Sequence, residues 1–254
     1  MSEAIPQFEI REIYPNIIQL TYEKRYDLCM SFLRLQEYYE SPEFKGRFFE
    51  LEEYMDWWQK NTGRGEFNYP NCWSGFNLPG PIVNEWIDKF GFKIDSRDGW
   101  EDWARWLNLR SGIRLKEQCL LDAVLKKVKY DLGRLSKCYV IGVSKDDGAE
   151  SRSKVIAHEV AHAFYTLYPD YKKNCQKLID EIRNSQGGKK LYENACKALS
   201  SLGYHKDVFD DELQALWSTR KTAKSLKKYG MLFVGNQKFI DNYKLFKKQV
   251  RKKR

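Results

Sequence analysis

The chain has 254 residues, a formal net charge of +9, 42% hydrophobic residues and 15% aromatic residues. This composition excludes a disordered chain and is sufficient for a large buried core. No apolar run approaches the roughly 20 residues that a membrane span needs, and residues 1–10 lack the apolar region of a signal peptide. The six scattered cysteines include no Cys-x-x-Cys pair, which is typical of free thiols in a reducing compartment. We therefore expect a cytoplasmic protein with no membrane partner.

The positive charge is concentrated at the C-terminal end. Residues 219–254 contain thirteen Lys and Arg against the single acid Asp241, a net charge of +12 that leaves −3 for the rest of the chain. Such a tail is able to contact nucleic acid or another polyanion. Because no base-reading motif accompanies the charge, the sequence favours a solvated helix end whose cations complement the helix dipole.

The first half of the chain predicts a mainly helical region. A short strand is expected over residues 16–22. The helix that follows ends before Pro42, and its apolar face is formed by Leu28, Phe32, Leu35 and Tyr39. Further helices are expected over residues 48–59, 82–90, 98–109 and 115–130. Residues 62–81 are rich in Gly, Pro, Asn and aromatic side chains, which predicts an ordered loop packed onto the protein.

The second half predicts a strong strand over residues 138–144, followed by a long helix that Ser151 or Ser153 would cap. The later elements are expected to be helices over 170–184, 189–202 and 208–222, a short strand over 231–234 and a terminal helix from Asp241. Together these elements predict an α+β fold. A mainly helical N-terminal part would cover residues 1–130, and a second part with the basic tail would cover residues 131–254.

Two of the three histidines lie four residues apart around a glutamate, as His158-Glu159-x-x-His162. On a helix, residues i and i+4 lie one above the other on the same face. The two imidazoles therefore reach one metal ion, and Glu159 projects toward a water beside it. Another stripe of the same helix is apolar and faces the core, through Ile156, Val160, Ala163 and Leu167. This pattern is the zincin metallopeptidase signature and predicts a Zn²⁺ site.

A catalytic zinc site needs a third protein ligand and an open coordination position. The best candidate is Glu212, near the start of an expected helix where acids are favourable. Ala215, one turn later, is small enough to let two helices approach closely. The rival third ligand is His205, which would give a three-histidine site. The residues leave both alternatives open, with Glu212 preferred.

With Glu212 in a Glu-x-x-Ala context on a separate helix, the chain resembles the gluzincin class of zinc metallopeptidases over roughly residues 138–218. The resemblance implies a zincin-like core, in which a small sheet packs on the active-site helix. It also implies that His158, His162 and Glu212 bind Zn²⁺ and that Glu159 is the general base.

One position departs from the thermolysin-type pattern within this class. Those enzymes carry an Asp four residues after the glutamate ligand, and this chain has Leu216 there. The carboxylate that orients a ligand histidine must then come from elsewhere, and Asp211 or Asp210 is expected to supply it.

The expected reaction is hydrolysis of a peptide bond in a peptide or protein substrate. Glu159 would take a proton from zinc-activated water and pass it to the leaving amine. Tyr204 and His205 are candidate hydrogen-bond donors to the oxyanion. The strand over residues 138–144 is expected to be the sheet edge that binds an extended substrate, through Tyr139, Ile141 and Val143.

Two alternatives remain. A catalytically inactive zincin scaffold would act as a binding or regulatory protein, although the intact Glu159 argues against this reading. With His205 as the third ligand and nucleic acid bound at the basic tail, the chain would instead resemble the SprT-like, DNA-associated proteases. Those proteins usually place the third histidine nearer the motif, which weighs against this alternative.

Overall fold

The computed structural model describes residues 4–63, 65–89, 112–219 and 236–252. Its sheet contains four strands in the order β1-β2-β4-β3. β2 and β4 pair in parallel, and the two outer pairs are antiparallel. The strands are β1 (Phe8–Tyr14), β2 (Ile17–Tyr22), β3 (Gly75–Pro79) and β4 (Tyr139–Ser144). The sheet thus combines strands from both sides of residue 130, and β1 and β3 are its two edges.

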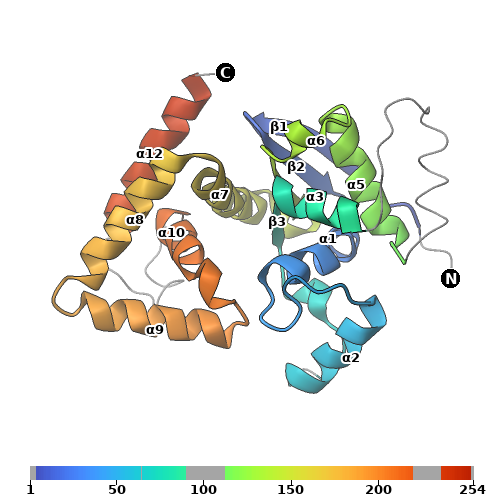
Figure 1. The fold of residues 1–254 in the computed structure, drawn as a ribbon, viewed down its shortest axis with the longest axis horizontal. Coiled ribbons are helices and arrows are strands. Elements are labelled where there is room, and N and C mark those ends of the chain that lie inside the picture. Colours follow the sequence, from blue (N-terminus) through green and yellow to red (C-terminus); the bar gives the residue numbers. More distant parts are fainter. Residues whose placement is uncertain (1–3, 64, 90–111, 220–235, 253–254) are drawn as a thin grey trace.

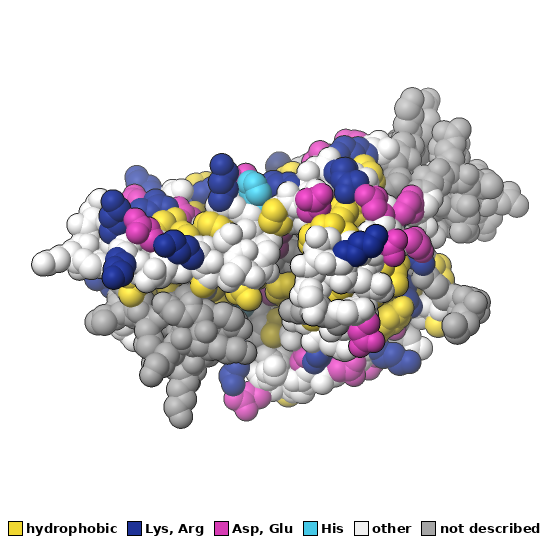
Figure 2. All heavy atoms as spheres, turned by 90° about the horizontal axis from the view of Figure 1, so that it is seen from below, with side chains coloured by type: hydrophobic (Ala, Val, Ile, Leu, Met, Phe, Trp, Pro, Cys, Tyr) yellow, Lys and Arg dark blue, Asp and Glu magenta, His cyan; other side chains and the backbone are white. Residues whose placement is uncertain are grey.

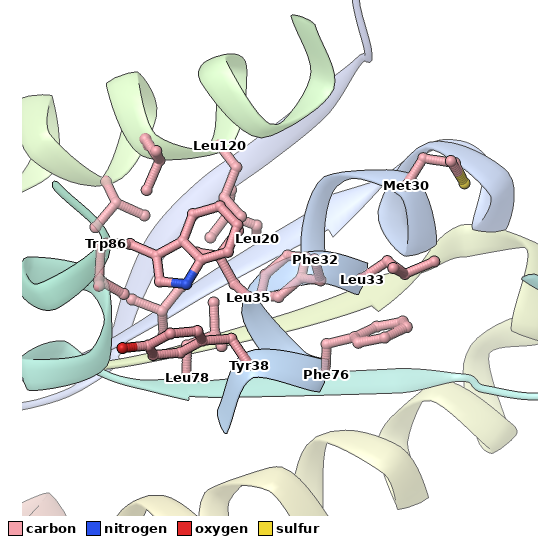
Figure 3. Close-up of a cluster of buried hydrophobic side chains, with 14 of the residues drawn as sticks. Leu20, Met30, Phe32, Leu33, Leu35, Tyr38, Phe76, Leu78, Trp86 and Leu120 are labelled. Carbon is pink, nitrogen blue, oxygen red and sulfur yellow. The ribbon is translucent and has the colours of Figure 1, made fainter. Parts of the chain in front are cut away.

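One face of the sheet is covered by helices from the first half of the chain, namely α1 (Arg25–Glu40), α3 (Gly80–Lys89) and α5 (Leu115–Lys127). Figure 3 shows Trp86 of α3 at the centre of this core, between Tyr38 and Leu35 of α1 and Leu120 of α5. α1 lies so close to the sheet that a Cβ at Gly142 of β4 would lie 2.6 Å from Phe32. α2 (Leu51–Asn61) extends the same core with aromatic side chains, and the short α6 (Leu132–Leu135) leads into β4.

The other face of the sheet is covered by α7 (Gly148–Leu167), which lies between the sheet and the remaining helices (Figure 1). Those helices are α8 (Pro169–Arg183), α9 (Gly188–Ser201), α10 (Phe209–Thr219) and α12 (Asn236–Lys252). α7, α8, α10 and α12 share a second buried core with the residues of β4 that point to this face, Tyr139 and Ile141. Because α7 contacts both the sheet and α10, it brings residues from the two halves of the chain together.

The predicted α+β class is confirmed, since the described residues form a mostly helical structure with one small mixed sheet. The helices expected around residues 28–39, 48–59, 115–130, 170–184 and 189–202 are present within a few residues of their predicted ends. The helix expected over 98–109 and the strand expected over 231–234 lie outside the described residues. None of the described helices is both long and apolar enough to cross a membrane.

The structure differs from the expectations at one strand and one loop. The strand β1 was not predicted, although Phe8 and Ile10 alternate with the charged residues Glu9 and Arg11. It turns into β2 at Asn16, whose φ of 62° suits the tight connection. The loop expected over 62–81 contains the 3₁₀ turn η1 (Tyr69–Asn71), the strand β3 and the start of α3. The sequence does not reveal β3, because the strand begins at Gly75 and ends at Pro79, and both residue types are typical of loops.

Candidate metal centre

The motif lies on α7, a helix of 20 residues that begins at Gly148. The expected cap at Ser151 or Ser153 is wrong, because the helix starts earlier, after the 3₁₀ turn η2 (Lys145–Asp147). This turn is tied to the start of α1. The Arg25 backbone N–H donates to Asp146 at 2.7 Å, and the Arg25 guanidinium pairs with Asp147. The start of α7 is therefore anchored to the opposite face of the sheet.

Three side chains converge beside α7. The Nε2 atoms of His158 and His162 are 3.2 Å apart. The carboxylate of Glu212, on α10, lies 3.5 Å from Nε2 of His162 and 3.8 Å from Nε2 of His158. Two ligand atoms of a tetrahedral zinc ion, each about 2.05 Å from it, are about 3.3 Å apart. Two imidazoles and one carboxylate at this spacing fit a zinc ion.

The three side chains differ in exposure. The side chains of His162 and Glu212 are 3% and 4% exposed, whereas that of His158 is 19% exposed. The site is therefore embedded in the protein and reaches solvent on the side of His158. Ala215, one turn after Glu212, is fully buried in the core shared by α7 and α10, which agrees with the close helix approach expected from its small side chain.

Asp211 supplies the carboxylate that was expected to orient a ligand histidine. Its Oδ1 lies 2.9 Å from Nδ1 of His162, so that the other ring nitrogen of His162 points to the cluster. Gln214 donates to the same Asp211 oxygen at 2.9 Å and to the carbonyl of Ala161 at 3.1 Å. Gln214 thus connects the carboxylate of Asp211 to the backbone of α7. This residue was not predicted from the sequence.

Asp210 has a different role from Asp211. Its carboxylate accepts hydrogen bonds from Arg183 of α8 at 2.8 Å and from the hydroxyl of Tyr192 of α9 at 2.6 Å. It therefore holds three helices together, and the orienting contact to the histidine comes from its neighbour.

The charges around His162 determine its protonation. Burial disfavours the imidazolium, but the carboxylates of Asp211 and Glu212 outweigh burial and raise the pKa of His162 well above its usual value. The two carboxylates therefore favour the protonated form of His162. A metal ion that binds there must displace this proton.

The expected general base, Glu159, is buried against the sheet. Its Oε2 accepts a hydrogen bond of 3.0 Å from Nδ2 of Asn77 on β3. Burial raises the pKa of Glu159, and His162 and Asn77 partly oppose this rise. A Cβ at Gly75 would lie 2.5 Å from Oε1 of Glu159 and 2.4 Å from Val155. Only glycine lets β3 approach Glu159 so closely.

The expectation that residues 138–144 form the sheet edge is wrong. β4 is paired on both sides, with β2 and with β3, so its backbone groups are not available to an added strand. Tyr139, Ile141 and Val143 are fully buried. The edge beside α7 is β3 instead. Tyr139 still serves the site indirectly, because its hydroxyl donates to Oδ1 of Asn77 at 2.5 Å.

Two residues of α1 also reach the site, and sequence reasoning missed both. Oε1 of Gln36 accepts the backbone N–H of Asn77 at 3.2 Å, and its Nε2 donates to Glu40 at 2.6 Å. Burial and the charge of Glu212 raise the pKa of Glu40 well above its usual value. The end of α1 therefore contacts the outer side of β3 and adds a further carboxyl group near the cluster.

Tyr204 and His205 lie outside the three-residue cluster. Nδ1 of His205 accepts the backbone N–H of Asp207 at 3.3 Å, and the residue begins the 3₁₀ turn η3 (Lys206–Val208). The Tyr204 ring packs edge-on against Trp73, with 6.3 Å between ring centroids. The segment before α10 thus contacts residues of the N-terminal half, and the His205 backbone N–H also donates to the Glu40 carbonyl at 3.4 Å.

These contacts connect the two halves of the molecule. Figure 2 shows a furrow between the half that carries α9 and the half that carries α2, with hydrophobic side chains along it. An ion pair of 3.1 Å between Lys45 and Asp207 also joins the halves. Tyr204 and His205 therefore have structural contacts in this arrangement, and their predicted role as oxyanion donors stays a prediction.

Comparison of the chain with known protein families, with curated proteins and with solved structures finds no match in any of the three. The resemblance to gluzincins therefore depends on the residues and the geometry described above.

Proposed function

We propose that this protein is a zinc-dependent metallopeptidase of gluzincin type that hydrolyses peptide bonds in a peptide or protein substrate. The proposal depends on one observation. Two imidazole nitrogens and the Glu212 carboxylate surround one point at the spacing of zinc ligands, beside the buried carboxylate of Glu159. The small sheet packed on α7 supports a zincin-like core as part of the same proposal.

Zinc held by His158, His162 and Glu212 supplies Lewis-acid polarisation of the scissile carbonyl and lowers the pKa of water toward about 7. Glu159 accepts the proton of the attacking water and delivers it to the leaving amine. Burial raises the pKa of Glu159, which makes its carboxylate a stronger proton acceptor. Asn77 holds one carboxylate oxygen and leaves the other for this transfer.

The substrate would lie beside β3 as an added strand. The N–H of Asn77 donates to Gln36 and therefore points away from β4. In an antiparallel strand, every second residue directs both of its backbone groups to the same side. The C=O of Asn77 and both backbone groups of Gly75 therefore also point away from β4. These groups are the ones that an extended peptide would use. The N–H of Asn77 also points to that side, but Gln36 already accepts it.

A cytoplasmic location belongs to this proposal. All six cysteines are free thiols in the structure, and this is the state in which a reducing compartment keeps them. The three-histidine alternative is not favoured, because His205 is not among the residues whose ligand atoms converge.

Zinc content of the purified protein, measured by elemental analysis, tests the proposal. We expect one equivalent of zinc in the wild type and in His205→Ala, and loss of zinc in Glu212→Ala. Glu159→Gln should retain zinc and lose peptidase activity by about 10²–10⁴-fold, the usual contribution of a general base. A wild type that takes up no zinc during reconstitution would contradict the proposal, and zinc loss in His205→Ala alone would favour the three-histidine site.

A further inference from the structure

The C-terminal helix α12 packs one side onto the rest of the protein. Phe239 lies against Trp217 with 5.1 Å between ring centroids, and Phe246 lies 5.3 Å from Phe164 of α7. Tyr243 is buried, and its hydroxyl donates to the carbonyl of Ala157 at 3.1 Å. The apolar side of α12 is thus committed to internal packing. The cations Lys248, Arg251 and Lys252 remain exposed near the end of this helix, as expected for a solvated helix end.

The remaining side of α12 carries a row of cations, which we call the basic stripe. Spacings of three and four residues place these side chains along one face of a helix. They line a shallow hollow of about 310 Å³, and the lining consists of Lys244, Lys247, Lys248, Arg251 and Lys252. The stripe spans the nine residues 244–252, with about 12 Å of helix between its two ends.

The stripe is not held in ion pairs by the described residues. None of its five members forms an ion pair with a described carboxylate, whereas Lys238 on the same helix pairs with Glu181 at 2.8 Å. Two members lie against aromatic rings instead, Lys247 at 5.5 Å from the centroid of Tyr243 and Arg251 at 5.7 Å from that of Tyr14. By contrast, the face in Figure 2 carries basic and acidic side chains close together.

This arrangement is more than complementation of a helix dipole. That effect decays within the last turn of a helix, and only Arg251 and Lys252 lie in the last turn of α12. Burial and, to a smaller extent, the neighbouring Arg251 lower the pKa of Lys247. A polyanion that binds the stripe would oppose the part of this effect that comes from Arg251.

We infer that the basic stripe of α12 is a binding surface for the phosphate backbone of nucleic acid. Duplex DNA presents one phosphate per about 1.7 Å of its axis, or about seven phosphates along the 12 Å of the stripe. A membrane surface fits less well, because an interfacial helix inserts a broad apolar face. The aromatic residues of α12 are packed inside the protein, and a single exposed leucine, Leu245, does not form such a face. The contact is made to phosphates and therefore does not depend on sequence.

This inference is independent of the proposed peptidase function, since no member of the stripe belongs to the metal centre. The two surfaces are nevertheless connected. The Lys247 ammonium lies over the Tyr243 ring, and the Tyr243 hydroxyl binds the carbonyl of Ala157, the residue before His158.

The test is fluorescence anisotropy of a labelled duplex DNA of about 30 base pairs, titrated with the full chain at salt concentrations from about 50 to 200 mM. The variant is Lys244→Gln/Lys248→Gln/Lys252→Gln, which removes three exposed charges of the stripe. The matched control is Lys189→Gln/Lys190→Gln/Lys197→Gln, which removes three exposed charges from α9. Thermal unfolding of each variant confirms that it is folded.

We expect the wild type to bind DNA, and the stripe variant to bind about tenfold or more weakly with a salt dependence reduced by about 2.7 in log–log slope. The control variant should change affinity by less than about twofold. The inference is overturned if the wild type does not bind DNA, or if the two variants lose affinity equally. Binding to anionic lipid vesicles without binding to DNA also overturns it.

Discussion

Asn77 and Glu159 are 82 positions apart in the chain, yet Nδ2 of Asn77 donates a buried hydrogen bond of 3.0 Å to Oε2 of Glu159. The Tyr139 hydroxyl donates to the side-chain oxygen of Asn77, and the side chain of Gln36 accepts the backbone N–H of Asn77. The edge strand is therefore fixed to the carboxylate that would act as general base. Most of the consequences that we expect for catalysis follow from this connection.

Replacing Asn77 with Ala should lower kcat by about 10–100-fold with little change in KM, because Glu159 keeps its place on α7 but loses its orientation. The Asn77 hydrogen bond lowers the pKa of Glu159. Its removal should therefore raise that pKa and move the acidic limb of the kcat/KM profile to higher pH. Steady-state kinetics across pH measure both effects.

Tyr139→Phe is the matched control for Asn77→Ala, since it removes only the hydroxyl that orients the amide. It should shift the acidic limb in the same direction by a smaller amount, and zinc content should be unchanged in both variants. An acidic limb that stays in place in Asn77→Ala would show that Asn77 does not tune the base.

Replacing Asp211 with Asn should weaken zinc binding by about 10–100-fold, because the carboxylate that orients His162 and supports its basicity is lost. Competition with a chelator of known affinity measures this change. Asp210→Asn is the matched control. It weakens the contacts to Arg183 and Tyr192 and should lower the unfolding temperature while zinc affinity stays within about twofold. Equal zinc loss in the two variants would argue against a specific role for Asp211.

The sequence predicts those parts of the site that depend on local spacing. His158 and His162 share one helix, so that their approach follows from the i, i+4 relation. Glu212 was predicted because a zinc site needs a third ligand. Asp211 or Asp210 was expected to orient a histidine because Leu216 occupies the usual orienting position. The structure brings the two histidines, Glu212 and Asp211 together.

The rest of the site depends on the order of strands in the sheet, which no local pattern encodes. Asn77 reaches Glu159 only because β3 pairs outside β4. Gln36 and Glu40 reach the same edge because α1 runs along the opposite face of the sheet and ends beside β3. Residues 138–144 have the stronger strand pattern because they are buried on both faces, and this burial is typical of a central strand rather than an edge.

Replacing Gly75 with Ala should abolish most activity, by about 10²-fold or more, because the new Cβ must displace Glu159 or Val155. Gly142→Ala is the matched control on the neighbouring strand. Its Cβ would collide with Leu28 and Phe32 in the other core and should cost about 1–3 kcal/mol of stability with kcat of the folded protein unchanged. Kinetics and urea unfolding of both variants separate the two effects. A fully active Gly75→Ala protein would contradict the close contact between β3 and the base.

Glu37 should make the stability of the fold depend on pH. Burial raises its pKa to about 7, although Tyr69, Tyr54 and Ser41 donate hydrogen bonds that oppose the rise. The folded state therefore binds a proton at Glu37 that the unfolded state, with a pKa of 4.5, has already released. The free energy of unfolding should fall as pH rises from about 4.5 to 7, by up to about 3 kcal/mol.

Glu37→Gln isolates this contribution, because glutamine stays neutral and still accepts the 2.8 Å hydrogen bond from the Tyr69 hydroxyl. Urea unfolding at several pH values between about 5 and 8 should give similar stabilities for the two proteins at the acidic end. At the basic end the variant should be the more stable protein, because the wild type must then bury a charged carboxylate. Parallel pH profiles for the two proteins would mean that Glu37 titrates alike in the folded and unfolded chains.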